Sequence, residues 1–137
     1  MTYFPDLSLY AYGHDSHTGV VHVGWLDSIH LYLKGAVDAR LIEKMKFLAS
    51  NPVELYRGVH ICELCVEPPD LVQTLLPNRM IDPNCSWMQW ARQRSSNGEI
   101  RVSGEGLVFA APLLIVHYIE THSYLPPSQF LKAVEAA

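Results

Sequence analysis

Two cysteines with two residues between them, Cys62 and Cys65, constrain what this chain can fold into more than any other feature. Such a turn can direct both sulfur atoms at one metal ion, and zinc prefers Cys thiolate and His nitrogen in tetrahedral geometry. Downstream, His117 and His122 have the spacing of paired histidine ligands. The long intervening stretch, residues 66–116, excludes a simple zinc finger, so we expect a site that the tertiary structure closes.

Helix geometry leaves the fourth ligand open. Residues five apart on an α-helix are rotated by about 140° from each other. His117 and His122 can therefore reach one ion only if the last helical turn loosens, which the nearby Tyr124 and prolines permit. Otherwise His60 competes for the position, because residues 60 and 62 share one face of a strand. The expected cofactor is zinc, and the candidate metal ligands are Cys62, Cys65, His117, His122 and His60.

Other interpretations of these residues remain open. On an apolar helix face, His117 can be a core histidine, and His122 can be a helix C-terminal residue that faces the dipole. The cysteine pair can be a redox motif, although it lacks the βαβ context of thioredoxin-like proteins. A zinc-dependent hydrolase is a further alternative, with Cys62, Cys65, His117 and a bound water as ligands. Glu63 or Glu120 would then act as the general base.

Composition narrows the class of protein. Ten Lys and Arg against fourteen Asp and Glu give a net charge of -4, which argues against nucleic-acid binding. No apolar segment reaches the roughly 18 residues of a membrane helix, and the start resembles no signal peptide. We therefore expect a cytoplasmic protein that binds neither nucleic acid nor membrane. In that reducing compartment the cysteine pair indicates metal or redox chemistry, while the third cysteine, Cys85, is interpreted as a small packed residue.

Hydrophobic periodicity predicts a mixture of helices and strands. The clearest helix covers residues 35–50, with Asp38 as a candidate N-cap and a proline after its end. Residues 99–103 and 107–111 flank a glycine-rich turn and predict a β-hairpin. The other expected elements are strands over 20–26 and 58–65, short helices over 71–75 and 87–93, a helix opened by Pro112, and a final helix over 127–137.

Without repeated βαβ units, this order favours an α+β fold. We expect a single small domain over residues 1–137, with a β-hairpin or small antiparallel sheet, three to four helices, and stabilisation by zinc. The N-terminal residues 14–17 contain two histidines and are interpreted as a polar turn rather than a metal site. His22 can face the core or the hairpin, and Asp27 with His30 can form a polar pair at the end of a strand.

A partner-binding surface is suggested by aromatic residues in a stretch without clear pattern. Trp87 and Trp90 are of the type enriched at interface hot spots, and Asp27 is a further candidate. The alternative is that both tryptophans lie on one side of a short helix and pack on the core.

Five segments of the chain resemble known sequences: residues 3–8, 23–27, 57–65, 111–119 and 122–130. They carry a Gly-x-His-x-Cys-Glu-x-Cys motif that ends at Cys65 and a His-Tyr-Ile-x-x-His-x-Tyr-x-Pro-Pro motif that starts at His117. On these residues the chain resembles, end to end, a family of small uncharacterised bacterial proteins without an established activity. The resemblance implies a bacterial, soluble, single-domain protein. The chain departs from the family pattern at residues 30–32 and 71–96, and the second stretch is where partner specificity would differ.

Together these features favour a non-enzymatic, zinc-stabilised interaction module. One concrete form is a bacterial immunity or antitoxin-type protein that neutralises a toxin, because an acidic surface suits a basic toxin domain. The small zinc-dependent hydrolase is the alternative, and a zinc-stabilised nucleic-acid-binding module is a third reading that the charge disfavours.

Overall fold

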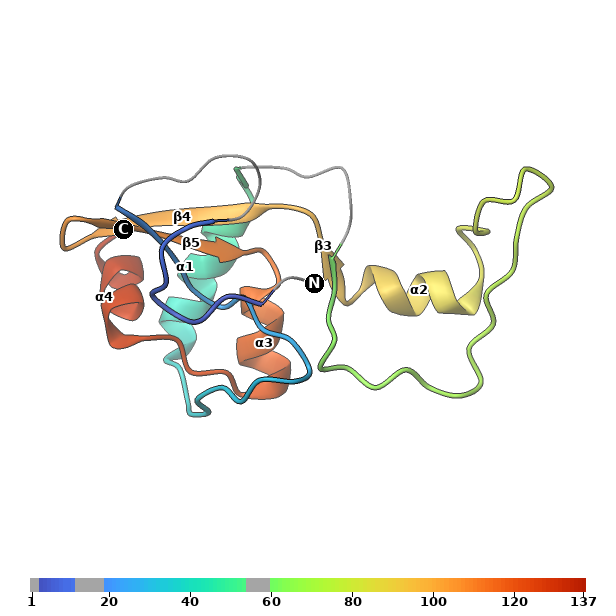
Figure 1. Ribbon diagram of the computed structural model, residues 1–137, viewed down its shortest axis with the longest axis horizontal. Helices are drawn as coiled ribbons and strands as arrows, with labels where there is room; N and C mark the ends of the chain where they lie inside the picture. Colours follow the sequence, from blue (N-terminus) through green and yellow to red (C-terminus); the bar gives the residue numbers. More distant parts are fainter. Residues whose placement is uncertain (1–2, 12–18, 54–59) are drawn as a thin grey trace.

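A three-stranded sheet with the order β1-β5-β4 lies at the centre of the fold (Figure 1). β4 (Glu99–Gly104) and β5 (Leu107–Pro112) form the predicted antiparallel hairpin. Its two-residue turn places Glu105 and Gly106 at φ 53° and 78°, as the tightest hairpin turns require. β1 (Val20–His22) pairs with β5 in parallel, so the sheet that contains the expected hairpin is mixed.

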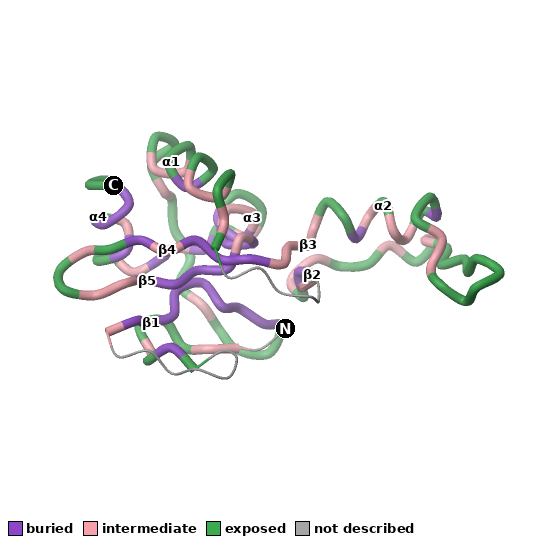
Figure 2. Tube along the Cα trace, turned by 90° about the horizontal axis from the view of Figure 1, so that it is seen from above, coloured by how far each residue is buried: buried purple, intermediate pink, exposed green. Residues whose placement is uncertain are grey.

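The computed structural model describes residues 3–11, 19–53 and 60–137. Within them, three helices lie on one face of the sheet, as seen above the strands in Figure 2: α1 (Ala39–Ala49), α3 (Ile115–His122) and α4 (Ser128–Ala136). α4 packs on β4, and α1 packs on both α3 and α4. These contacts bury the apolar faces of all three helices against one side of the sheet.

Three of the predicted boundaries are wrong, and one holds. α1 begins at Ala39 rather than at Gly35, because Asp38 is the N-cap and accepts the N–H of Arg40 at 2.8 Å. α3 begins after the predicted start, because Pro112 is the last residue of β5 and pairs with Glu99. The final helix lies where it was predicted. The predicted strand over residues 20–26 ends at His22.

The main core fills the space between the sheet and the helices. Phe109 on β5 and Phe130 on α4 are fully buried and meet edge to face, with ring centroids 6.0 Å apart. The close approach of α4 depends on Gly104, where an added Cβ would lie 2.7 Å from the Cβ of Ala133. Such a contact would force the helix away from the strand.

A second, smaller core covers the opposite face of the sheet. Because side chains alternate along a strand, Ala110 of β5 points away from the helices and packs with Tyr10, Val20 and Trp25. His22 is fully buried there, stacked on Phe4 at 3.8 Å, so it faces the core. Burial lowers the pKa of His22 to about 4, and the ring is therefore neutral at neutral pH.

An arm formed by residues 66–94 projects from one side of the body (Figure 1). Its root is a two-stranded antiparallel ladder between β2 (His60–Ile61) and β3 (Ser95–Ser96). The returning half contains α2 (Ser86–Arg92), the second of the predicted short helices. No described residue between 66 and 98 belongs to either hydrophobic core. The arm is therefore held to the body mainly at its root.

The predicted helix over residues 71–75 is wrong. Leu75 instead forms an antiparallel bridge with Ile81 across a turn in which Arg79 adopts φ 67°. A short apolar run does not distinguish a helix from an extended segment. Cys85 is buried, as expected, but on the arm, where its sulfur caps α2 by accepting the N–H of Met88 at 3.4 Å.

The described residues thus form an α+β fold of four helices, a mixed three-stranded sheet and a two-stranded ladder. None of the helices among them is long and apolar enough to cross a membrane. The assignment of residues 1–137 to a single domain remains a prediction.

Candidate metal centre

Four predicted ligands meet where the root of the arm touches α3. One side-chain donor atom each of Cys62, Cys65, His117 and His122 lies within 4.8 Å of the other three. The Nε2 atom of His122 is 3.4 Å from both sulfurs, and Nε2 of His117 is 3.2 Å from the sulfur of Cys65. This group could hold a metal ion, and it joins segments that are far apart in the sequence.

The cysteine half of the site is a tight turn after β2. The N–H of Cys62 donates to the carbonyl oxygen of Arg94 at 2.8 Å, which ties the turn to the returning half of the arm. The backbone N–H groups of Leu64 and Cys65 donate to the Cys62 sulfur. Burial nevertheless raises the pKa of the Cys62 thiol to about 11. A reactive redox cysteine needs a lowered pKa, so the environment of Cys62 does not favour that reading.

The histidine half lies at the end of α3. His122 is the last residue of the helix, and Ser123 follows in the left-handed region at φ 55°, with its N–H donating to the carbonyl of Tyr118. The two imidazole rings meet edge to face, with centroids 5.1 Å apart. The two rings therefore lie close together, although both residues belong to the same helix and are five positions apart. Burial lowers the pKa of both histidines and favours the neutral imidazole that metal binding needs.

The other sequence candidates near the site do not join the group. His60 lies on β2, paired with Ser96, and is not one of the four clustered donors. The carboxylate of Glu63 accepts from the Ser28 hydroxyl at 3.4 Å, and that of Glu120 is 3.3 Å from the Lys46 ammonium. Both glutamates proposed as a general base therefore have partners outside the cluster.

A hydroxyl beside the site was not foreseen. The Thr121 hydroxyl oxygen lies 3.4 Å from Nδ1 of His117, whose Nε2 faces the sulfurs. A partner on the second nitrogen fixes the tautomer and orientation of a metal-binding histidine. Thr121 lies four residues after His117, on the same face of the helix, and this spacing is the signal that the sequence offered.

We expect Thr121→Val to weaken metal binding by about ten-fold, because Nδ1 of His117 loses its acceptor. Thr121→Ser retains the hydroxyl and should retain the affinity. Competition with a chromophoric chelator measures both variants, and equal affinities of Thr121→Val and the unmodified protein would contradict the assignment.

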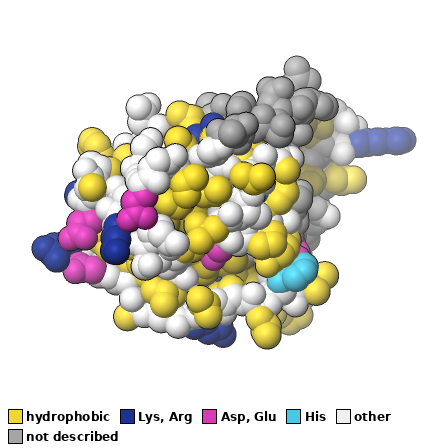
Figure 3. All heavy atoms as spheres, turned by 60° about the vertical axis from the view of Figure 1, so that its left-hand side comes forward, with side chains coloured by type: hydrophobic (Ala, Val, Ile, Leu, Met, Phe, Trp, Pro, Cys, Tyr) yellow, Lys and Arg dark blue, Asp and Glu magenta, His cyan; other side chains and the backbone are white. Residues whose placement is uncertain are grey.

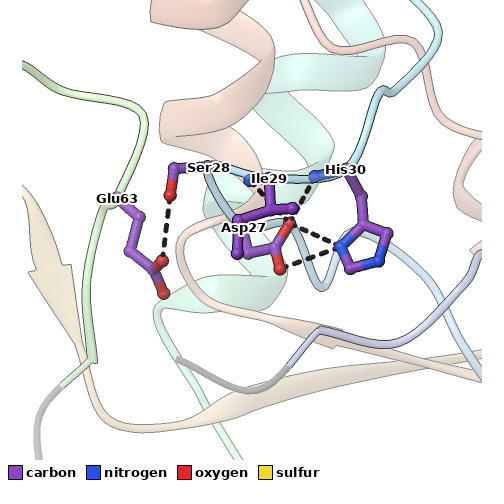
Figure 4. Close-up of polar contacts among 5 residues, drawn as sticks. All are labelled: Asp27, Ser28, Ile29, His30 and Glu63. Carbon is purple, nitrogen blue, oxygen red and sulfur yellow. Dashed lines mark hydrogen bonds and ion pairs between the residues drawn. The ribbon is translucent and has the colours of Figure 1, made fainter.

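Asp27 lies at the end of the buried segment that follows β1, and it is itself buried. Figure 4 shows its carboxylate accepting from the N–H groups of Ile29 and His30 and from Nδ1 of His30, the last at 2.9 Å. The expected polar pair of Asp27 and His30 is therefore present. The carboxylate of Asp27 thus accepts its hydrogen bonds from residues 29 and 30 of its own loop, which leaves little hydrogen-bonding capacity for a partner protein.

Trp87 and Trp90 lie on α2 of the arm, half-buried and outside both cores. The guanidinium of Arg94 lies over the ring of Trp90, 5.1 Å from its centroid. Their role in partner binding remains a prediction. The alternative, that both tryptophans pack on the core, is wrong, because neither belongs to or packs against either hydrophobic core. The histidines of residues 14–17 lie outside the described residues.

Comparison with known proteins agrees with the end-to-end resemblance noted above. No curated protein and no solved structure matches the chain significantly. A family model described as a domain of unknown function, DUF7919, matches residues 2–135. The chain therefore belongs to the DUF7919 family, whose function is unknown.

Proposed function

We propose that this protein is a non-enzymatic interaction module in which a structural zinc ion anchors the arm to the body, and that the arm binds a protein partner. The observation that carries the proposal is the place of the four donors. Two lie at the root of the arm and two on α3 of the body, so one ion would bond both parts.

The donor set supports zinc. In a tetrahedral site with Zn–S of 2.3 Å and Zn–N of 2.0–2.1 Å, sulfur and nitrogen ligands are about 3.6 Å apart. Three of the four sulfur–nitrogen distances in this group are 3.2 to 3.4 Å, which is slightly shorter. Two cysteines with two histidines are a common structural zinc set, and soft thiolates select zinc over magnesium or calcium.

The alternative of a zinc-dependent hydrolase has less support. A catalytic zinc needs three protein ligands and an open position for water. Here His122 lies within reach as a fourth ligand. The two glutamates that would activate the water have other partners: Glu63 accepts a hydrogen bond from Ser28, and Glu120 forms an ion pair with Lys46.

Exposed apolar side chains on the arm support a protein partner. Leu75 and Met80, near its tip, are 63% and 64% exposed, and Val66 and Val72 are exposed as well. Exposed apolar groups gathered on one element are typical of binding surfaces. On the face of the body shown in Figure 3, acidic and basic side chains stand next to each other instead of forming the basic patch that nucleic acid requires.

The partner we propose is a basic protein, and a toxin domain neutralised by an immunity-type protein is its most specific form. The net charge of -4 favours the encounter with a basic partner through electrostatic steering.

Affinity capture from an extract of the native host tests this proposal. Tagged protein should recover a stable, basic protein partner in a salt-sensitive manner. The double variant Leu75→Ser/Met80→Ser should lose that partner. The matched control is Phe47→Ser on α1, whose side chain is 78% exposed on the body and which should keep the partner. Absence of any stable partner, or equal capture by both variants, would contradict the proposed role of the arm.

A further inference from the structure

An apolar loop on the body, residues 28–34, lies beside the metal centre. Three of its side chains are almost fully in solvent: Ile29, Leu31 and Leu33 are 82%, 98% and 73% exposed. Between them, Tyr32 is partly buried and packs edge to face on Tyr124, with centroids 6.1 Å apart. The loop is thus anchored through Tyr32 while its aliphatic side chains face water.

The second half of the loop is hydrogen-bonded to residues 122–125, a segment that begins with the candidate ligand His122. The Tyr32 hydroxyl donates to the backbone carbonyl of His122 at 3.0 Å. The N–H of Leu125 donates to the carbonyl of Leu33 at 2.9 Å, and the N–H of Gly35, just after the loop, donates to the carbonyl of Ser123 at 3.0 Å. The position of this half therefore follows the position of the end of α3.

The first half of the loop contacts the cysteine turn. The Ser28 hydroxyl donates to the carboxylate of Glu63 at 3.4 Å, as Figure 4 shows, and Glu63 stands between the two cysteine ligands. The two ends of the loop are thus fixed to the two halves of the metal site. An ion that joins those halves fixes the distance between both anchors of the loop.

We infer that the metal centre positions the apolar loop 28–34 as well as the arm, so that occupancy of the site controls how Ile29, Leu31 and Leu33 are presented. This inference rests on the metal site of the proposed function. Without the ion, the last turn of α3 is a helix end, where local opening costs little. With the ion, His122 is bonded to the cysteine turn, and the Tyr32 hydrogen bond is made to a fixed carbonyl.

Linkage supplies the test. If bound zinc stabilises the Tyr32 anchor, the anchor must stabilise bound zinc by the same factor. Tyr32→Phe removes only the hydroxyl and keeps the ring beside Tyr124. We expect it to weaken zinc binding by about five-fold, the range of one hydrogen bond, in competition with a chelator. The control on the same loop, Leu31→Ser, should bind zinc as the unmodified protein does.

Hydrogen exchange gives a second readout on the zinc-loaded proteins. The amides of Gly35 and Leu125 should exchange about five-fold faster in Tyr32→Phe, while those of Val102 and Phe109 in the hairpin should not change. Unchanged zinc affinity in Tyr32→Phe would overturn the inference and leave the metal centre standing. An unmodified protein that binds no zinc would overturn the proposed metal centre, and the inference with it.

Discussion

Removal of the bound metal is expected to lower the free energy of unfolding by several kcal/mol, up to about 10 kcal/mol. The reason is that one ion would replace many weak contacts at the root of the arm, where no described residue of the arm itself reaches a hydrophobic core. The cysteine pair and the histidine pair are far apart in the chain, so the site exists only in the folded protein, and the free energy of metal binding adds to the free energy of folding. Elemental analysis of the purified protein, followed by thermal melts with and without a chelator, measures the effect.

Substitution of single ligands should reproduce the effect of the chelator. Cys65→Ser and His117→Ala each remove one donor of the group, and we expect both to lose the metal and to melt at lower temperature. Two matched controls are available. Cys85→Ser changes a cysteine that caps α2, where serine is also a good cap, and His60→Ala changes a histidine outside the group. Both controls should keep the metal.

Three results would count against this account. If the protein is isolated without any chelator and contains no metal, the proposed metal centre is wrong. Ligand variants that melt like the unmodified protein would show that the site does not stabilise the fold. A variant that keeps its metal and its fold after loss of one histidine would point to an open coordination position and revive the hydrolase reading.

The ligand set was largely predictable because its chemistry is local. The spacing of Cys62 and Cys65 fits a single turn, and Cys and His are the ligands that zinc prefers. The choice between His60 and His122 was not predictable from the spacing. β2 ends at Ile61, so residues 60 and 62 no longer share one face of a strand, and the rings of His117 and His122 meet although an ideal helix sets residues five apart at about 140°. α3 ends at His122, before a serine with positive φ. Glycine would have signalled that helix end, whereas serine does not.

The fold shows the same division between local and long-range information. The hairpin of β4 and β5 was predicted because Gly104 and Gly106 mark its turn, and α1 and α4 were predicted from their apolar periodicity. The parallel pairing of β1 with β5 was not predicted, because the local sequence of a strand does not indicate which other strand it will pair with. The arm was missed for a related reason. Its apolar residues resemble those of a core segment, and only the tertiary structure shows that they face outward.

The second large effect is expected from the body, not from the metal site. Phe130→Ala should lower the free energy of unfolding by about 3 to 5 kcal/mol, because it removes a fully buried ring and leaves a cavity against Phe109. Urea denaturation of the metal-loaded protein measures the change. Gln129→Ala, an exposed neighbour on the same helix, is the control and should change the stability by less than about 0.5 kcal/mol.

The metal content of the folded Phe130→Ala protein makes this variant informative. Phe130 belongs to the packing of α4 on the sheet, whereas the four donors belong to α3 and the root of the arm. We therefore expect Phe130→Ala to melt at a lower temperature but to keep its metal while it is folded. Cys65→Ser should instead lose the metal while the packing of Phe130 stays intact. If folded Phe130→Ala has lost its metal, the packing of α4 must help to position the ligands. The metal centre would then depend on the whole body and would not act as a separate clamp on the arm.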